Sequence, residues 1–149
     1  MALRRLAREL AEWQAEEDGS LTAAPVADDN LYVWKCSFAG PAGTPYEGGR
    51  FFLDMNIEQD YPHKPPKITL ATQVFHPQVN AQGGMCLPIL DQANWTSTNK
   101  IKDVIFAAQQ LLGDPNANSP YNAEAGELLA RDRAAFDARA REFTQRYAM

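Results

Sequence analysis

The strongest constraint on the fold is a strict alternation of apolar with other side chains over residues 51–58. The alternating apolar positions are Phe51, Leu53, Met55 and Ile57, and the positions between them are Phe52, Asp54, Asn56 and Glu58. Successive side chains of a β-strand point to opposite faces, so a period of two predicts a half-buried strand. We therefore expect a sheet with one covered face.

Two further strands are predicted from neighbouring runs. Residues 31–38 are rich in aromatic and β-branched side chains, which favour strands. Residues 67–70 form a shorter run, and the prolines at positions 62, 65 and 66 exclude a helix or a central strand just before it. Glycine and proline at 40–45 separate the first two strands. Strands that follow one another through short turns indicate one antiparallel sheet.

Helical periodicity is predicted on both sides of this sheet. Apolar side chains recur at helical spacing over roughly residues 2–17, and again over 101–112, 123–130 and 132–147. A helix, then strands, then a long loop and further helices predict an α+β fold. The length of 149 residues suits one domain with a full core, so a single domain over residues 1–149 is expected.

Composition excludes several classes of protein. Fourteen Lys and Arg against nineteen Asp and Glu give a net charge of −5, which argues against nucleic acid as the main partner because phosphate binding requires a basic field. No apolar run approaches the roughly 20 residues that span a bilayer, so no membrane partner is expected. Arg8, Glu9 and Glu12 interrupt the start of the chain as a secretory signal. Two cysteines are too few for a disulfide scaffold, which favours a reducing compartment.

Residues 71–100 lack sustained periodicity, and a stretch of this length inside a domain is often functional. It contains Cys86 just after two glycines, where a thiol is more accessible than it would be in a strand. Cys36, by contrast, lies in a predicted strand and is expected to be a core residue. The amides of Gln78 and Asn80 could donate hydrogen bonds to an oxyanion formed at an attacked thioester or carbonyl.

Three kinds of chemistry compete for this loop. A reactive thiol at Cys86 is one. A Cys/His hydrolase is another, with His76 ten residues before Cys86, although no cysteine-protease signature surrounds the thiol and a His-Pro dipeptide is equally compatible with a structural role. A zinc site is the third, and two cysteines fifty residues apart with His63 and His76 do not supply one, so no metal is expected. The chain also lacks a glycine-rich phosphate loop, and no cofactor is expected.

Six motifs occur in an order and spacing that resemble the ubiquitin-conjugating (E2) enzymes. They are Pro45-Tyr46-Glu47-Gly48-Gly49-Arg50-Phe51, Tyr61-Pro62-His63-Lys64-Pro65-Pro66-Lys67, His76-Pro77, Cys86-Leu87, Asn94-Trp95 and Asp114-Pro115-Asn116. Together they span nearly the whole chain. The resemblance implies the UBC fold: an N-terminal helix, a four-stranded antiparallel meander sheet, a long active-site loop and C-terminal helices.

The resemblance also implies a reaction. In E2 enzymes the cysteine ten residues after the histidine of a His-Pro-Asn motif carries ubiquitin or a ubiquitin-like modifier as a thioester, and here that residue is Cys86. An activating enzyme (E1) loads it with ATP that the E2 does not bind. The cysteine then passes the modifier to a lysine or to the cysteine of a ligase (E3). Such a carrier needs a free thiol, which favours the cytoplasm, with the nucleus as a second compartment. The E2 is expected to be a monomer.

Partner surfaces follow from the same resemblance. Residues of the first helix contact E1, namely Arg4, Arg5 and Arg8. That helix forms the E3-docking surface together with two loops, at His63 and at Thr96, Ser97 and Thr98. Residues on a later helix hold the thioester-linked modifier in the closed state of the family, namely Asp103, Phe106 and Gln110.

Three departures from the family pattern indicate which group, lysine or cysteine, accepts the modifier from Cys86. Gln78 replaces the motif asparagine, Pro88 replaces the commoner aspartate two residues after the cysteine, and Ser119 replaces an aspartate found in lysine-reactive members. Neither Pro88 nor Ser119 can deprotonate a lysine, whose ordinary pKa is about 10.4, whereas a thiol needs less help. The chain resembles the Cys-Leu-Pro subgroup that serves HECT and RING-between-RING (RBR) ligases.

Two alternatives stay open at this point. His63 replaces a phenylalanine common in that subgroup, and Ser97-Thr98 replaces Pro-Ala, so the E3 set could differ and include RING ligases. The Gln78 replacement also leaves open a non-catalytic E2 variant that serves only as a binding module in a ubiquitin pathway.

Overall fold

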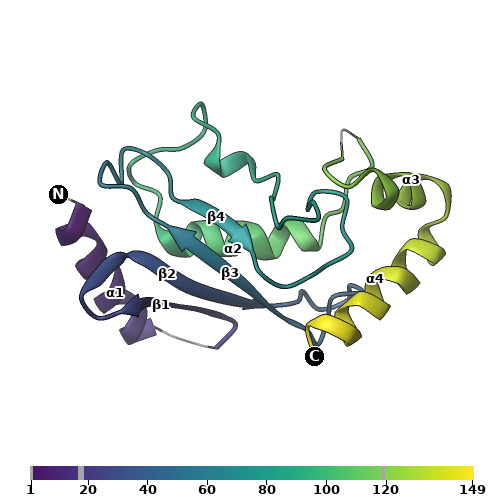
Figure 1. Cartoon of the computed structure of the whole chain (residues 1–149), viewed down its shortest axis with the longest axis horizontal. Helices are drawn as coiled ribbons and strands as arrows, with labels where there is room; N and C mark the ends of the chain where they lie inside the picture. Colours follow the sequence, from purple (N-terminus) through teal and green to yellow (C-terminus); the bar gives the residue numbers. More distant parts are fainter. Residues whose placement is uncertain (1, 17–18, 119) are drawn as a thin grey trace.

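Four strands pair in sequence order and form an antiparallel sheet, with helices at both ends of the chain (Figure 1). The computed structural model describes residues 2–16, 19–118 and 120–149. The elements are α1 (Ala2–Glu16), β1 (Leu21–Ala27), β2 (Asn30–Ala39), β3 (Arg50–Asn56), β4 (Lys67–Leu70), the 3₁₀-helix η1 (Pro88–Leu90), α2 (Ile101–Leu112), α3 (Ala123–Arg131) and α4 (Arg133–Tyr147). This order confirms the α+β class, and the four-stranded sheet confirms the topology that the family resemblance implied.

The alternation of apolar residues at 51–58 appears in β3 as an alternation of buried and exposed side chains. Phe51, Leu53 and Met55 are fully buried, whereas Phe52 and Asp54 between them are exposed. In the register of the sheet, Leu53 of β3 lies opposite Cys36 of β2, which is also buried. Strand β3, which the sequence pattern predicts most clearly, therefore contributes three fully buried side chains to the core.

The edge strand β1 is the element that the pattern of residues 21–27 did not predict. It contains three alanines and Pro25, which are poor strand formers, and only Leu21 and Ala23 are buried. Proline is tolerated in an edge strand because one side of that strand makes no ladder hydrogen bonds. The pairing shifts register between Pro25 and Ala27, next to this proline.

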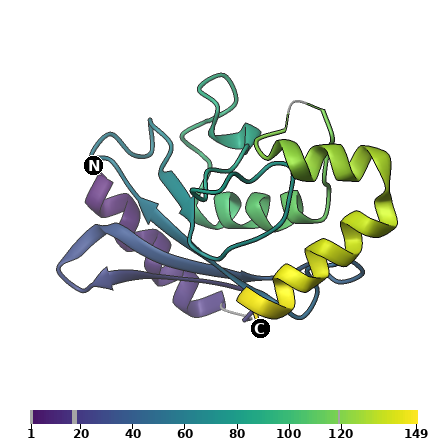
Figure 2. The ribbon, with the colours of Figure 1, turned by 45° about the vertical axis from the view of Figure 1, so that its right-hand side comes forward.

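Helix α2 covers one face of the sheet, where it packs against β1 and β2 (Figure 2). Its inner face carries the buried Ile101, Val104, Ile105, Ala108 and Leu112. Helix α1 lies at one end of the molecule and α3 with α4 at the other. No described helix has both the length and the apolar character that a bilayer crossing requires.

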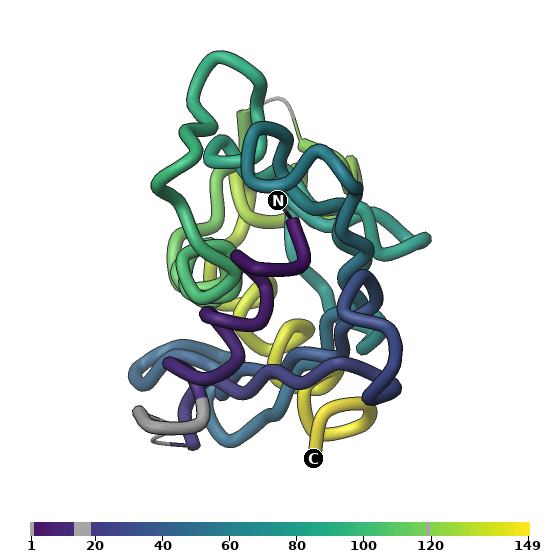
Figure 3. Tube along the Cα trace, turned by 90° about the vertical axis from the view of Figure 1, so that its left-hand side faces the viewer, coloured from purple at the N-terminus to yellow at the C-terminus, as the bar shows by residue number. Residues whose placement is uncertain are grey.

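The segment 71–100 is mostly irregular, as predicted, with two local exceptions. Residues Pro88–Leu90 form η1, and Val79 makes an isolated antiparallel bridge to Met85. Seen from the α1 side, the segment leads directly into α2 next to α1 (Figure 3). The segment therefore runs from the end of β4 to the start of α2 and passes beside α1.

Candidate active site

A tight turn at residues 80–84 fixes the loop that precedes Cys86. The side-chain oxygen of Asn80 accepts hydrogen bonds from the backbone nitrogens of Gln82 (3.0 Å) and Gly84 (2.8 Å). Gly83 has a φ of +86°, and its carbonyl accepts a bond from the Leu70 nitrogen at 2.9 Å. A Cβ on Gly83 would lie 2.3 Å from the Leu70 carbonyl oxygen, so only glycine fits. Asn80 thus orders the turn and ties it to β4.

Cys86 follows this turn as a free, partly exposed thiol. Its backbone nitrogen donates to the Gln78 carbonyl at 3.0 Å, which sets the cysteine beside the His76-Pro77-Gln78 run. Pro88 is exposed and opens η1, and its carbonyl accepts a bond from Asp91. Pro88 has no group that accepts a proton from an amine. Ser119 lies outside the described residues.

Both the nitrogen and the oxygen of the Gln78 side-chain amide form hydrogen bonds with the backbone of Asn116. Its Nε2 donates to the Asn116 carbonyl at 2.5 Å, and its Oε1 accepts from the Asn116 nitrogen at 2.9 Å. The side chain is only 6% exposed. Because both bonds point to the segment before α3, this amide holds two loops together, and in this arrangement its donor does not face Cys86. Loop order is therefore the role that the geometry supports for Gln78.

His76 is fully buried and is also engaged on both sides. Its Nδ1 accepts a bond from the Gln78 nitrogen at 3.0 Å, which makes Nε2–H the donor to the Leu111 carbonyl at 2.9 Å. Burial lowers the pKa of His76 to about 4, so the ring is neutral at physiological pH. A ring with both nitrogens occupied has none left to take a proton from Cys86, which argues against the Cys/His hydrolase.

Tyr121 is a residue of the site that the sequence argument missed. Its backbone nitrogen donates to the Pro77 carbonyl at 2.7 Å, and its ring remains half exposed. Negative charge at Cys86, together with burial, raises the pKa of Tyr121. The residue stands in an irregular segment thirty-five positions after the cysteine, and no local pattern marks it.

Comparison with known proteins decides the family. The family model described as "Ubiquitin-conjugating enzyme" matches residues 5–144. The chain belongs to the ubiquitin-conjugating enzyme (E2) family. The E2 domain of a Toxoplasma gondii ubiquitin conjugating enzyme is similar to it, with 34% identity over all of both chains and a TM-score of 0.92. This match confirms the UBC fold with its N-terminal helix.

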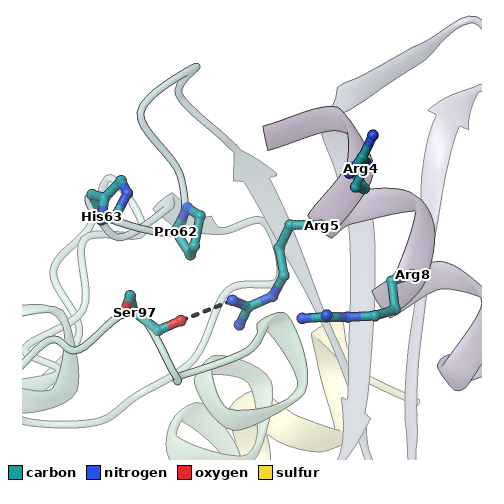
Figure 4. A pocket seen from close by; sticks show the side chains of 6 residues that line it. All are labelled: Arg4, Arg5, Arg8, Pro62, His63 and Ser97. Carbon is teal, nitrogen blue, oxygen red and sulfur yellow. Dashed lines mark hydrogen bonds between the residues drawn. The ribbon is translucent and has the colours of Figure 1, made fainter. Parts of the chain in front are cut away.

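A basic cavity of about 500 Å³ lies between α1 and two loops of this E2 (Figure 4). Its lining residues are Arg4, Arg5, Arg8, Pro62, His63 and Ser97. Arg4 is exposed and makes no ion pair or hydrogen bond within the part of the chain that the structure describes. Arg8 is exposed and makes a loose pair with Glu12 at 3.8 Å. We call this site the arginine cavity.

Arg5 differs from the other two arginines because its guanidinium is already bound. It donates to the carbonyls of Ser97 (2.8 Å) and Asn99 (2.7 Å) and pairs with Glu9 at 2.9 Å. Glu9 is buried and also accepts bonds from the Tyr61 hydroxyl and from the Ile101 nitrogen. This network ties α1 to the loop before α2, so Arg5 shapes the arginine cavity from within.

The other predicted partner residues are exposed. The hydroxyls of Thr96 and Thr98 lie 2.8 Å apart at the surface. On α2, Phe106 is 51% exposed, and Gln110 follows one turn later on the same face. Asp103 accepts a bond from the Lys100 nitrogen at 2.9 Å and so caps the helix as well. Among the described residues, no group of His, Cys, Asp and Glu is arranged to hold a metal ion.

Proposed function

We propose that this E2 accepts ubiquitin, or a ubiquitin-like modifier, from E1 as a thioester on Cys86. The observation that carries the proposal is the contrast between its two thiols. Cys86 is partly exposed in the loop of the family motif. Cys36 is buried, and burial together with the charge of Asp54 raises its pKa to about 12. Because the thiolate is the nucleophile, only Cys86 is available for the reaction.

The proposed reaction is two successive acyl transfers. The Cys86 thiolate attacks the thioester carbonyl of the loaded E1, the new carbon–sulfur bond forms, and the E1 cysteine leaves as a thiolate. In the second step an acceptor attacks the same carbonyl, and Cys86 leaves as a thiolate. The E2 contributes loop order through Asn80, Gln78 and His76, which hold the backbone around the thiol.

We propose that the preferred acceptor is the catalytic cysteine of a HECT or RBR ligase. A lysine acceptor must lose a proton before it attacks, and general-base help contributes roughly 10²–10⁴-fold in rate. Pro88 stands where the family commonly has an aspartate, and it supplies no base. A thiol acceptor is already partly ionised near neutral pH.

A loading assay with a panel of E1–modifier pairs and ATP tests the first step. The unmodified E2 and the Cys36→Ser variant are expected to form a conjugate that reducing agent cleaves. Cys86→Ser is expected to form no such conjugate. Absence of a thioester with every pair would leave the non-catalytic binding module as the better description.

Discharge of the loaded E2 to free cysteine and free lysine tests the acceptor. Pro88→Asp is expected to speed lysine discharge by roughly tenfold or more and to leave cysteine discharge within about twofold, because only the amine gains from a base. The matched control is Gln92→Asp, which adds the same charge at a nearby exposed position. Lysine discharge by the unmodified E2 as fast as cysteine discharge would refute the thiol preference.

We propose that the arginine cavity binds E1 and E3. Arg4→Glu breaks no interaction with the described residues, so it changes the charge of the surface alone. We expect loading to slow by roughly tenfold at low salt. The control is Arg146→Glu, the same charge change at an exposed position of α4. Equal loading rates for the two variants would contradict the assignment.

A further inference from the structure

Strand β4 forms one edge of the sheet, and one residue on its outer side has unused main-chain groups (Figure 1). The bond from the Ala71 nitrogen to the Phe52 carbonyl, at 2.8 Å, fixes which residues of this segment face β3. Because the direction alternates along an antiparallel strand, Lys67 and Thr69 also face β3, whereas Ile68 turns its N–H and C=O outward. Neither of these two groups makes a hydrogen bond with a described residue.

The outer edge of β4 is closed on both sides of Ile68. Pro66, two residues earlier, is buried and has no N–H to donate. Leu70, two residues later, donates its N–H to the Gly83 carbonyl, in the turn before Cys86, at 2.9 Å. Ile68 is therefore the open position of this edge in the part of the chain that the structure describes, and it lies two residues from the contact with the active-site turn.

A groove of about 520 Å³ contains this open position. Its wall includes Ile68, Met85, which precedes Cys86, and Trp95, which lies in the loop before α2. His63 lines this groove and also lines the arginine cavity. The groove therefore runs from the arginine cavity to the residue next to the thiol, which is the course of a segment that binds at one and reacts at the other.

The chemistry of the groove indicates what it binds. An unpaired N–H and C=O on one edge residue match the main chain of an extended peptide, which adds to a sheet edge as a further strand. Lys64 and Lys67 line the groove against a single acidic residue, Glu58. The ion pairs of these lysines, with Asp60 at 3.2 Å and with Glu58 at 3.1 Å, are exposed and therefore weak. An acidic peptide is complementary to this charge.

We propose that the groove binds an extended, acidic segment of the acceptor ligase, which pairs with Ile68 as a fifth strand and leads the ligase cysteine to Cys86. This inference rests on the proposed function and names the binding mode of its acceptor. The modifier is a poorer match, because the residues proposed to dock it lie on α2, and α2, which the structure describes in full, contributes nothing to the groove. Free cysteine carries no such segment, so its reaction with the thioester does not depend on the groove.

Disulfide exchange at Cys86 tests the groove without modifier, E1 or ligase. Hexapeptides with a cysteine at one end, and alternating valine and glutamate or valine and lysine after it, compete with glutathione for Cys86, while Cys36 is buried. The peptide thiolate attacks the mixed disulfide, and glutathione leaves as a thiolate. We expect the valine–glutamate peptide to displace glutathione at about tenfold lower concentration than the valine–lysine peptide.

Two lysine variants locate the charge that this preference depends on. Lys67→Glu is expected to remove most of the preference for the acidic peptide. Lys35→Glu makes the same charge change at an exposed lysine of β2, which does not line the groove, and is expected to keep the preference. Equal displacement by the acidic and the basic peptide in the unmodified protein would overturn the proposal, as would equal effects of the two variants.

Amide hydrogen exchange at Ile68, measured by NMR, tests the strand pairing itself. We expect this amide to exchange at least about tenfold more slowly in the mixed disulfide with the valine–glutamate peptide, because it then donates to the peptide main chain. Ile68→Pro removes the N–H and keeps the bonds between β3 and β4, so it should weaken peptide binding by about fivefold relative to Ile68→Val. An unchanged exchange rate at Ile68 would overturn the proposal even if the proline variant does not fold.

Transfer from the loaded E2 separates this inference from the proposed function. Ile68→Pro is expected to slow transfer to the catalytic domains of a panel of HECT and RBR ligases by about fivefold and to leave discharge to free cysteine within about twofold. Equal slowing of both reactions would place the defect at the thioester and overturn the groove assignment. Failure to load with every modifier would contradict the proposed function, whereas the peptide measurements decide the groove on their own.

Discussion

The Gln78→Glu substitution is expected to weaken the tether between the active-site loop and the segment before α3. Glutamate has the shape of glutamine, so packing is kept. The bond that Oε1 accepts from the Asn116 nitrogen can also be kept. The bond that Nε2 donates to the Asn116 carbonyl cannot, because a carboxylate has no hydrogen to donate and faces that oxygen with like charge.

The size of the effect follows from the burial of this side chain. One lost bond costs about 1 kcal/mol net, and the unsatisfied carbonyl with a carboxylate beside it adds roughly 1–2 kcal/mol. We therefore expect a loss of about 2–3 kcal/mol at pH 7. For a domain of this length 1 kcal/mol corresponds to about 2–4 °C, so the midpoint of thermal unfolding should fall by about 4–12 °C.

Thermal and urea unfolding of matched variants measure this loss. Gln82→Glu is the control, because Gln82 is exposed in the same loop and gains the same charge. We expect it to stay within about 0.5 kcal/mol of the parent. Equal unfolding midpoints for Gln78→Glu and Gln82→Glu would show that the Asn116 bonds add nothing to stability, and would remove the basis for assigning Gln78 to loop order.

A pH series adds a second check on the same variant. The partial negative charge on the Asn116 carbonyl oxygen, together with burial, raises the pKa of the introduced carboxyl in the folded state above the ordinary value of about 4.3. The protonated carboxyl can donate to that carbonyl again. The deficit relative to the parent should therefore be small near pH 4 and grow as pH rises through the raised pKa, in contrast to Gln82→Glu.

Three further results are expected. The pKa of His76 is about 4 in the fold against 6.5 as the ordinary value, so unfolding free energy should fall by about 3 kcal/mol as pH drops from 6.5 to 4, because only the unfolded chain takes up the proton there; urea titrations across that range measure it. Glu9→Ala should cost about 3–5 kcal/mol in unfolding free energy, since it removes a buried carboxylate and leaves the part-buried Arg5 without its charged partner. Glu12→Ala, one turn along the same helix with exposed partners, should lower the unfolding midpoint far less than Glu9→Ala does. Iodoacetamide at pH 8 should label Cys86 and leave Cys36 unmodified in the native protein, as peptide mass spectrometry would show.

The sheet was predictable where burial follows a simple period. Residues 51–57 alternate in sequence and in burial, so β3 could be located from the pattern alone. The edge strand β1 could not, because alanine and proline occupy the positions where strand formers would stand. Its pairing with β2 holds it in place, and a pairing partner elsewhere in the chain leaves no mark on a local pattern. Strand β1 was expected only because the family resemblance implied a sheet of four strands.

The site divides in the same way. Local sequence placed Cys86 in an accessible loop after two glycines, which the structure bears out in its partial exposure. It could not identify Asn116 or Glu9, whose hydrogen bonds join residues 38 and 92 positions apart. Arg4, Arg5 and Arg8 look alike in the sequence. In the structure Arg5 is bound by Ser97, Asn99 and Glu9, whereas Arg4 is unpaired among the described residues, and this difference depends on tertiary contacts.

The same contacts explain how the loop accommodates an amide longer than the asparagine of the family motif. The extra methylene of Gln78 lets the amide reach Asn116 and make both backbone bonds. Asn80 orders the turn that precedes Cys86. Two amides thus order different parts of the loop, Gln78 through Asn116 and Asn80 through the turn. Because the two side chains share no partner, we expect the losses of stability from Gln78→Glu and Asn80→Ala to add in the double variant.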